Sequence, residues 1–266
     1  MKLSSVFLPI FLMLAISTMT GTGIISASAQ ERVKVQTIEE FDRDGKPVPL
    51  SKGTADLLAY ISQTLHIQFQ VQRVPWKRAM ENALHDDIIL LGMSINKERS
   101  AKYLFSDAIN ANGNWLVTRC DANFPFNSLQ DLKGKLIGVV AGTSSGEAFD
   151  AEVNKLFRVE NDIGAGISRL QKLMAKRMDA LVWYDSVDTP KALEHAINLS
   201  YTKRGLHNSG NAKVFCVQEK PISIVSNHFA MRISPANRQL LDRINLAMAK
   251  GRKEGSIPPV ATTILH

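Results

Sequence analysis

Asp131-Leu-Lys-Gly-Lys-Leu-Ile-Gly-Val-Val-Ala-Gly-Thr-Ser-Ser-Gly-Glu-Ala-Phe149 is the stretch of the chain that decides the fold. Its apolar run at residues 136–140 predicts a strand. The glycines and hydroxyls at 142–146 predict a tight turn before a helix that begins at Glu147. Free backbone N–H groups converge at the positive end of such a helix, which suits a bound carboxylate or phosphate. The stretch therefore predicts an anion site made by Gly142, Thr143 and Ser144.

The same turn also matches Gly-x-Ser-x-Gly, the nucleophile elbow of serine hydrolases, with Ser144 as the nucleophile. Acids and histidines follow in the order that a catalytic triad needs, namely Asp179, Asp185, Asp188, His195, His207 and His228. These residue types are common, so the order alone is weak support. No glycine-rich oxyanion segment of the His-Gly-Gly-Gly kind precedes the turn. Anion binding is therefore favoured, and acyl hydrolysis stays open as the alternative.

Segments of strand and helix character alternate along the chain, which is typical of an α/β fold with a largely parallel sheet. Strands are predicted at 33–37, 67–73, 88–93, 136–140 and 180–183. Helices are predicted at 56–66, 76–84, 147–157, 167–177 and 235–250. The pattern starts again after Pro125, so two α/β units joined near Trp115–Asp121 are expected.

The first 29 residues have the features of an export signal. Lys2 is the only charge, residues 6–16 are apolar, and Ala27-Ser28-Ala29 provides an A-x-A cleavage site. The apolar run is too short to span a bilayer comfortably, and retention as an N-terminal anchor is the alternative. We expect residues 1–29 to be removed and the mature chain to be exported.

Composition restricts the partners of the mature chain. The formal net charge of the whole sequence is +7, and removal of Lys2 lowers it by one. This mild excess favours anionic ligands, but no basic stripe interleaved with aromatics is present, so nucleic-acid binding is not expected. The six histidines show no metal-ligand spacing, so a metal site is not expected. The separation of Cys120 and Cys216 does not decide whether they form a disulfide.

A second anion-binding cluster follows the apolar strand predicted at 88–93. Ligands of α/β folds bind at the carboxyl ends of sheet strands, so Ser94, Asn96 and Arg99 are expected to face a ligand. The guanidinium of Arg99 suits a carboxylate bound through two parallel hydrogen bonds. The alternative is a surface ion pair of Arg99 with Glu98 or Asp107.

Five short motifs occur in order over about residues 33–255. They are Pro75-Trp76-x-Arg78-Ala79, Gly92-Met93-Ser94-x-Asn96-x-x-Arg99, Phe105-Ser106-Asp107, the Asp131–Ser144 stretch and Arg177-Met-Asp-Ala-Leu-Val182. No single motif is decisive, but their order and spacing are specific. In this order the chain resembles the bacterial extracellular solute-binding proteins of family 3.

The resemblance implies a two-lobed, type II periplasmic binding protein, in which each lobe is a mostly parallel sheet flanked by helices. One lobe would hold residues 30–118 and 228–266, and the other residues 119–227. In the family, the arginine that matches Arg99 binds the α-carboxylate of the ligand, and the turn that matches Gly142-Thr143-Ser144 meets the same group from the other lobe. A membrane ABC permease is the implied partner, a monomer is expected, and no catalysis or cofactor is implied.

The chain departs from the family pattern in three places. Glu-Glu-Phe-Asp-Arg-Asp at 39–44 replaces an aromatic-Pro-Pro-aromatic loop, and Asn96 replaces a threonine. Tyr184, one residue before Asp185, stands where amino-acid binders place an aspartate for the ligand ammonium. Carboxylate recognition is therefore expected to be retained better than ammonium recognition. Trp76, Tyr184 and Asp185 are candidate ligand contacts, with core packing for Trp76 and helix capping for the other two as alternatives.

We therefore expect a periplasmic protein that binds a small carboxylate-bearing solute, a polar amino acid first, between two lobes that close by a hinge motion. One alternative is an exported enzyme on the same fold, either a Ser144 hydrolase or a dehydratase-like protein that uses Glu39, Glu40 or Asp185 as acid or base. The other alternative is a ligand-binding subunit that signals to a membrane sensor.

Overall fold

The computed structural model describes residues 30–41, 46–185, 189–203 and 213–260. The predicted export signal at 1–29 lies outside these residues. Within the part of the chain described, no helix has the length and apolar character needed to cross a bilayer.

A single nine-stranded sheet runs through the whole molecule in the order β2-β1-β3-β9-β4-β7-β5-β6, with β8 paired to β4. The strands are β1 (Glu31–Ile38), β2 (Ile67–Val74), β3 (Ile88–Ser94), β4 (Tyr103–Arg119), β5 (Leu136–Val140), β6 (Arg158–Asp162), β7 (Ala180–Asp185), β8 (Phe215–Val217) and β9 (Ser223–Arg232). At one end β1 pairs in parallel with β2 and β3, and at the other β5 pairs in parallel with β6 and β7. The predicted α/β class with parallel strands is confirmed.

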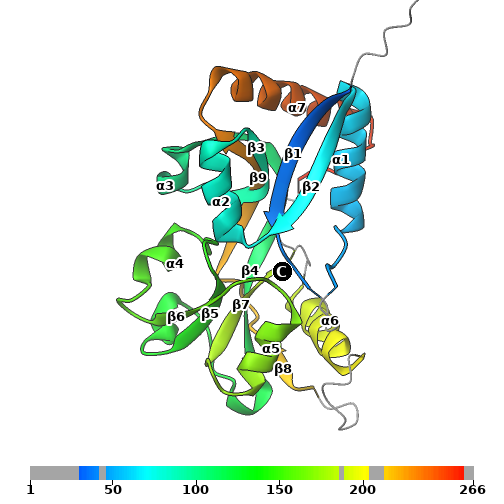
Figure 1. The fold of residues 1–266 in the computed structure, drawn as a ribbon. Coiled ribbons are helices and arrows are strands. Elements are labelled where there is room, and N and C mark those ends of the chain that lie inside the picture. Colours follow the sequence, from blue (N-terminus) through cyan, green and yellow to red (C-terminus); the bar gives the residue numbers. More distant parts are fainter. Residues whose placement is uncertain (1–29, 42–45, 186–188, 204–212, 261–266) are drawn as a thin grey trace, which may run out of the picture.

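Helices flank the sheet in both halves of the molecule (Figure 1). They are α1 (Lys52–Leu65), α2 (Trp76–His85), α3 (Lys97–Ser100), α4 (Glu147–Glu152), α5 (Ile167–Met174), α6 (Pro190–Lys203) and α7 (Pro235–Lys253), with short 3₁₀ turns at Cys120–Ala122 and Leu129–Leu132. In Figure 1, β1–β3 with α1, α2, α3 and α7 form the upper half. The lower half contains β5–β8 with α4, α5 and α6.

Two antiparallel strands join the halves. β4 has 17 residues and pairs with β9 from Tyr103↔Arg232 to Asn114↔Ser223. From Gly113 onward the other edge of β4 pairs with β7, which belongs to the lower half. β4 overlaps the junction that we predicted near residues 115–121.

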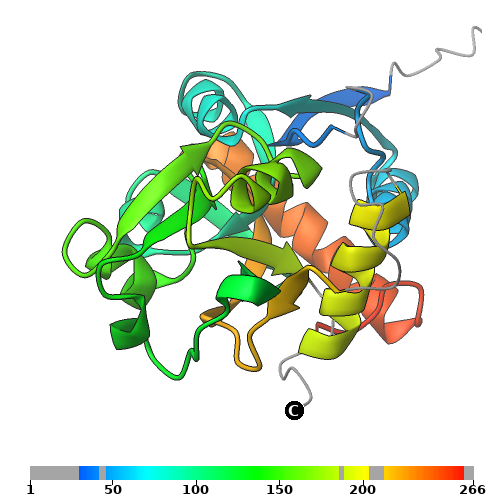
Figure 2. The same ribbon diagram turned by 90° about the horizontal axis from the view of Figure 1, so that it is seen from below.

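The hydrophobic core is divided between the halves. In the upper half, one cluster surrounds Ile61 and Phe229, and a second surrounds Trp76 and Met93. In the lower half, one cluster includes Trp115, and the other packs under the 3₁₀ turn at Leu129–Leu132 and α4. Figure 2 views the lower half, where α6 (yellow) packs beside β8 through the edge-to-face rings of Tyr201 and Phe215.

Local signals account for several helix ends. The Ser51 hydroxyl caps α1 by accepting from the backbone N–H of Thr54, and the Ser234 hydroxyl caps α7 in the same way ahead of Pro235. The helix predicted at 147–157 is too long, because α4 ends at Glu152 and Asn154 adopts a left-handed φ of 62°. Residues 153–157 instead form a turn closed by a bridge between Val153 and Phe157, and the edge strand β6 follows.

The two cysteines form a disulfide that links the end of β4 to β8. The Cα atoms of Cys120 and Cys216 lie 5.1 Å apart. This settles the pairing that the sequence left open.

Candidate functional site

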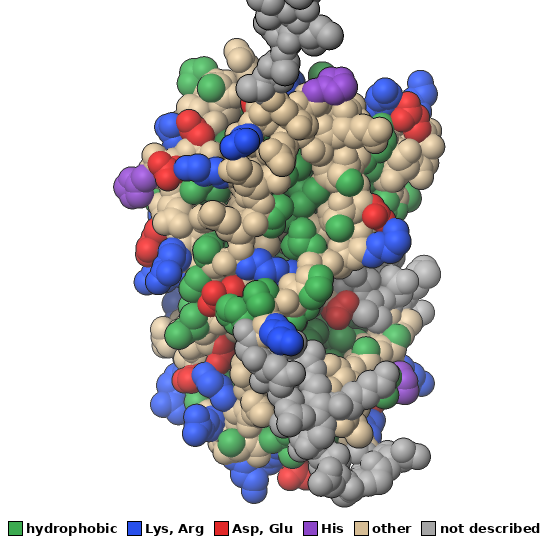
Figure 3. All heavy atoms as spheres, turned by 45° about the vertical axis from the view of Figure 1, so that its right-hand side comes forward, with side chains coloured by type: hydrophobic (Ala, Val, Ile, Leu, Met, Phe, Trp, Pro, Cys, Tyr) green, Lys and Arg blue, Asp and Glu red, His purple; other side chains and the backbone are tan. Residues whose placement is uncertain are grey.

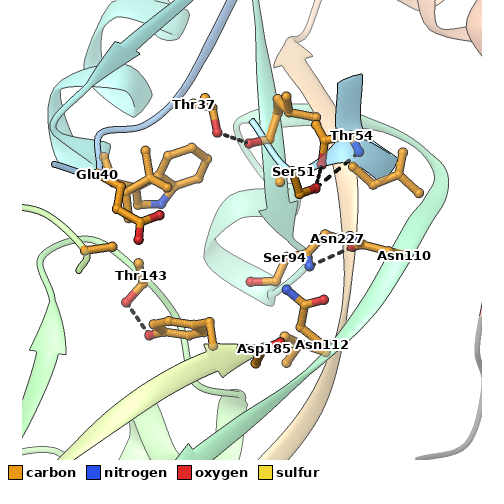
Figure 4. A pocket seen from close by; sticks show the side chains of 18 of the residues that line it. Thr37, Glu40, Ser51, Thr54, Ser94, Asn110, Asn112, Thr143, Asp185 and Asn227 are labelled. Carbon is orange, nitrogen blue, oxygen red and sulfur yellow. Dashed lines mark hydrogen bonds between the residues drawn. The ribbon is translucent and has the colours of Figure 1, made fainter. Parts of the chain in front are cut away.

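A cavity of about 480 Å³ lies between the two halves and is lined by residues of both. Figure 4 shows polar side chains from several elements converging on it. Hydroxyl and amide groups are prominent in the lining, namely Thr37, Ser51, Thr54, Ser94, Asn110, Asn112, Thr143, Ser144 and Asn227. In the space-filling view, acidic and basic side chains lie along the junction of the two halves (Figure 3). The size is that of a small-molecule site.

Arg99 is a buried cation of the cavity wall, with 7% of its surface exposed. Its Nη1 donates to the carbonyl oxygen of Ser94 at 2.8 Å and to the Ser94 hydroxyl at 2.7 Å. Its Nη2 reaches the other half and donates to the carbonyl oxygen of Gly142 at 2.8 Å. Among the described residues, no carboxylate forms an ion pair with Arg99, so the surface pairing with Glu98 or Asp107 is not observed.

The donors of Arg99 are not exhausted by these bonds. A guanidinium has five N–H donors, and the bonds to Ser94 and Gly142 use three of them. Nε–H and one Nη2–H have no acceptor among the described residues, so two charged donors remain for a ligand oxygen. Burial lowers the pKa of the Arg99 guanidinium from its usual value, while the nearby Asp150 acts in the opposite direction.

Asn96 positions Arg99 and does not line the cavity. Its side chain caps the short helix α3 by accepting from the backbone N–H of Arg99 at 2.8 Å. The cap orients the helix turn from which the guanidinium extends.

The turn at 142–146 faces Arg99 from the lower half. Gly142 has a left-handed φ of 81°, and a Cβ at this position would lie 2.8 Å from Cε of Met80. Glycine therefore allows the turn to approach α2. Gly142 itself contributes its carbonyl oxygen to Arg99 and is not part of the cavity lining.

The N–H groups of this turn are largely occupied, in contrast to the free cradle that we predicted. Thr143 N–H donates to the carbonyl oxygen of Val140 at 3.0 Å, and Ser145 N–H donates to Oδ1 of Asp150 at 3.1 Å. Gly146 N–H donates to the Ser144 hydroxyl at 3.3 Å. An acidic residue on α4 has thus taken the position of an anion at the helix start.

Side-chain hydroxyls remain at the cavity beside the turn. The hydroxyl of Thr143 is hydrogen-bonded to that of Tyr184 at 2.5 Å, and both residues line the cavity. Trp76 is buried in the core of the upper half, as its alternative predicted, and it also lines the cavity. Asp185 lines the cavity at the end of β7.

Among the described residues, those proposed for a hydrolase triad do not assemble around Ser144. The Ser144 hydroxyl donates to Asp150, and no described histidine contacts it. Nδ1 of His228 is bonded to the Ser106 carbonyl oxygen, and Asp179 accepts from the backbone N–H of Leu136. Asp188 and His207 lie outside the described residues.

Sequence reasoning missed a row of asparagines on β4. Asn110, Asn112 and Asn114 alternate on one face of the strand, and the first two line the cavity. Asn227 on β9 donates to Oδ1 of Asn110 at 2.9 Å, and Asn114 donates to the Ser223 hydroxyl at 2.7 Å. The spacing of two residues between these asparagines could have indicated the row, because it places three amides on the same side of one strand.

Arg169, also absent from our predictions, forms part of the cavity floor. It is paired with the buried Asp162 and donates to two carbonyl oxygens of the sheet. Among the described residues, no group of three or more histidine, cysteine or acidic side chains is placed to hold a metal ion.

Comparisons with known proteins identify the fold. The model of the bacterial extracellular solute-binding proteins, family 3, matches residues 53–262. A mutant of ArgBP from T. maritima is similar in structure, with a TM-score of 0.65, 21% identity, and coverage of 85% of this chain and 91% of that one. An ancestral arginine-binding protein bound to glutamine has a TM-score of 0.64 and 23% identity over 86% and 95% of the two chains. A putative L-cystine ABC transporter from Listeria monocytogenes has a TM-score of 0.63 and 20% identity over 85% and 92%. No curated protein matches the chain significantly.

Proposed function

We propose that this chain, which belongs to the bacterial extracellular solute-binding proteins, family 3, captures a small carboxylate-bearing solute in the periplasm and passes it to an ABC permease. The two binding lobes in this proposal are residues 30–118 with 228–266, and residues 119–227. A polar amino acid is the first candidate, because structures of similar fold hold arginine or glutamine.

The state of Arg99 carries the proposal. A buried guanidinium without a carboxylate partner is costly unless a ligand supplies the negative charge. Its free Nε–H and Nη2–H fit both oxygens of one carboxylate, and the Thr143 hydroxyl lies on the facing wall of the cavity.

Closure around the solute is supported by contacts between the halves. Besides the Arg99–Gly142 bond, the backbone N–H of Lys97 donates to the Glu147 carboxylate at 3.1 Å. The backbone N–H of Ala165 donates to the carbonyl oxygen of Glu39 at 3.3 Å. A solute that bridges the walls would favour this closed arrangement over an open one.

We propose binding without catalysis, since Ser144 is engaged by Asp150 and has no histidine partner among the described residues. Export by removal of residues 1–29 and a monomeric state complete the proposal. Coupling to a membrane sensor in place of a permease is the remaining alternative, and the genes that neighbour the coding sequence distinguish the two.

A ligand screen on the mature protein tests this function. Thermal shifts are measured with the common L-amino acids and a set of small organic acids, because a ligand at 100 times its Kd adds about 2.7 kcal/mol to stability. Hits are titrated by calorimetry into the wild type, Arg99→Lys and Arg238→Lys. The last is a matched control on an exposed face of α7.

Lysine cannot form the planar fork, so Arg99→Lys is expected to weaken binding by about 2–5 kcal/mol, while Arg238→Lys leaves affinity unchanged. A screen in which no carboxylate shifts the melting temperature contradicts the proposed function. If the wild type and Arg99→Lys bind the solute with equal affinity, the solute carboxylate does not bind to Arg99.

A further inference from the structure

We propose that Glu40 is a specificity-determining residue that binds a cationic group of the solute. This inference rests on the proposed function and deepens it, since it assigns the second charged end of the ligand. In Figure 4 the carboxyl group of Glu40 points into the cavity, between Thr37 and Thr143.

The backbone around Glu40 holds its side chain at the junction of the halves. Glu40 follows β1 in the upper half and forms a parallel bridge with Ala165 of the lower half. A Cβ placed on Gly166 would lie 3.3 Å from Cγ of Glu40, so glycine is needed for this close approach. The Glu40 carboxylate therefore occupies a defined position when the halves are in contact.

The carboxylate has no partner of opposite charge. Among the described residues, no donor forms a hydrogen bond or an ion pair with the Glu40 side chain, although the residue is half-buried. A half-buried carboxylate at the wall of a cavity is stabilised by a cation or a strong donor.

The arginines that line the cavity do not supply that cation. Arg169 is paired with Asp162, and Arg73 donates to the carbonyl oxygen of Ile38 at 3.2 Å. Arg99 is bonded to Ser94 and Gly142, and the proposed function assigns its two remaining donors to the solute carboxylate. The cavity thus presents a free guanidinium edge and, separately, a free carboxylate. A solute that carries both a carboxylate and a cation complements the two.

Glu40 shares the cavity with a second carboxylate, that of Asp185 at the end of β7. Asp185 has an interaction within the chain, whereas no described donor is bonded to the Glu40 side chain. Glu40 is therefore the carboxylate that a cationic group of the solute would meet.

A purely structural role for Glu40 makes a different prediction. α5 begins after Gly166 with no side-chain cap and no acid in its first turn, so a nearby carboxylate can stabilise the helix start. In that case the loss of the charge changes stability and the affinity for all ligands alike.

Calorimetric titration of the mature wild type, Glu40→Gln and Glu39→Gln separates these roles. Glu39 is the matched control, because its side chain packs against Gly164 and does not line the cavity. The probes are L-arginine, L-glutamine and glutaramate, which is glutamine without its ammonium group. Melting temperatures without ligand are recorded for all three proteins.

The proposal predicts that the wild type binds at least one of the two amino acids more than tenfold tighter than glutaramate. Glu40→Gln should lower the affinity for that amino acid at least tenfold and the affinity for glutaramate less than threefold. Glu39→Gln should leave both affinities unchanged.

Three results overturn the proposal and leave the proposed function intact. In the first, the wild type binds glutaramate as tightly as the amino acids. In the second, the affinity of Glu40→Gln for every probe is within threefold of that of the Glu39→Gln control. In the third, Glu40→Gln loses affinity equally for all probes and its melting temperature without ligand is lowered. Failure of the wild type to bind any of the three probes also overturns it. The wider acid screen then decides the proposed function separately.

Discussion

Replacement of Asp162 by asparagine tests how the floor of the cavity is held together. Asp162 is 4% exposed, and its Oδ2 accepts from Nε of Arg169 at 2.9 Å. Its Oδ1 accepts from Nζ of Lys172 at 2.5 Å. Arg169 is 2% exposed and also donates to the carbonyl oxygens of Val182 and Gly138, both at 2.9 Å. One ion pair therefore ties α5 to three adjacent strands.

Asp162→Asn preserves the volume of the side chain but removes the charge that neutralises Arg169. Loss of one partner of a buried ion pair costs about 3–5 kcal/mol, because the remaining charge stays buried and uncompensated. Lys172 is partly exposed, so water solvates its ammonium group and its share is small. We expect the free energy of unfolding to fall by about 3–5 kcal/mol, a large part of the typical total of about 5–15 kcal/mol.

Urea unfolding followed by circular dichroism measures the difference, with Asp121→Asn as the control. Asp121 forms an ion pair of the same length, 2.9 Å, with Arg119, but its side chain is 69% exposed. Its loss should cost about 0–1 kcal/mol. If the free energy of unfolding of the Asp162→Asn protein is within about 1 kcal/mol of the wild-type value, with an unchanged m-value, the reasoning is refuted. Burial would then not make this ion pair more important than an exposed one.

Three further substitutions extend the tests. Ser144→Ala should lower ligand affinity, measured by calorimetry, by about tenfold or less, because the Ser144 hydroxyl already donates to Asp150. A chromogenic ester assay should show no hydrolysis by the wild type or by the variant. Asp131→Asn should reduce the acid sensitivity of the melting temperature. Hydrogen bonds from the backbone N–H groups of Asn127 and Ser128 lower the pKa of Asp131, so its stabilisation is present above the unfolded pKa and is lost as the pH falls through the lowered folded pKa. Replacement of both Cys120 and Cys216 by serine removes a disulfide that spans 96 residues. The free energy of unfolding, measured by chemical denaturation, should fall by about 2–4 kcal/mol.

Elements with a strong local pattern could be predicted from the sequence. The strand predicted at 136–140 coincides with β5, and the buried apolar run at 88–93 lies within β3. β6 was missed because its sequence, Arg-Val-Glu-Asn-Asp, is polar and pairs at the edge of the sheet, where one side needs no neighbour. β4 was missed because its 17 residues serve two different environments and pair with strands more than 60 residues away.

Those parts of the candidate site that depend on one residue type at one place in the chain could be predicted from the sequence. The positions of Arg99 and of the Gly142-Thr143-Ser144 turn followed from strand ends and turn chemistry, and both lie at the junction of the halves. The occupation of the turn by Asp150 was not predictable, because the competition between a carboxylate of the chain and one of a ligand depends on geometry in three dimensions. The same holds for Glu40, whose neighbour Gly166 is 126 residues away in the sequence.

Three arginines line the cavity, and the groups bonded to them separate two of these arginines. Arg169 uses three of its five N–H donors, one for the Asp162 carboxylate and two for sheet carbonyl oxygens, so its charge is neutralised within the fold. Arg99 is also buried and also uses three donors, but these go to the hydroxyl and carbonyl oxygens of Ser94 and Gly142 and none goes to a carboxylate. A buried charge without a bonded counterion lowers stability unless a ligand supplies one. Under the proposed function the solute carboxylate is that counterion, which accounts for a buried arginine at the junction of the two halves.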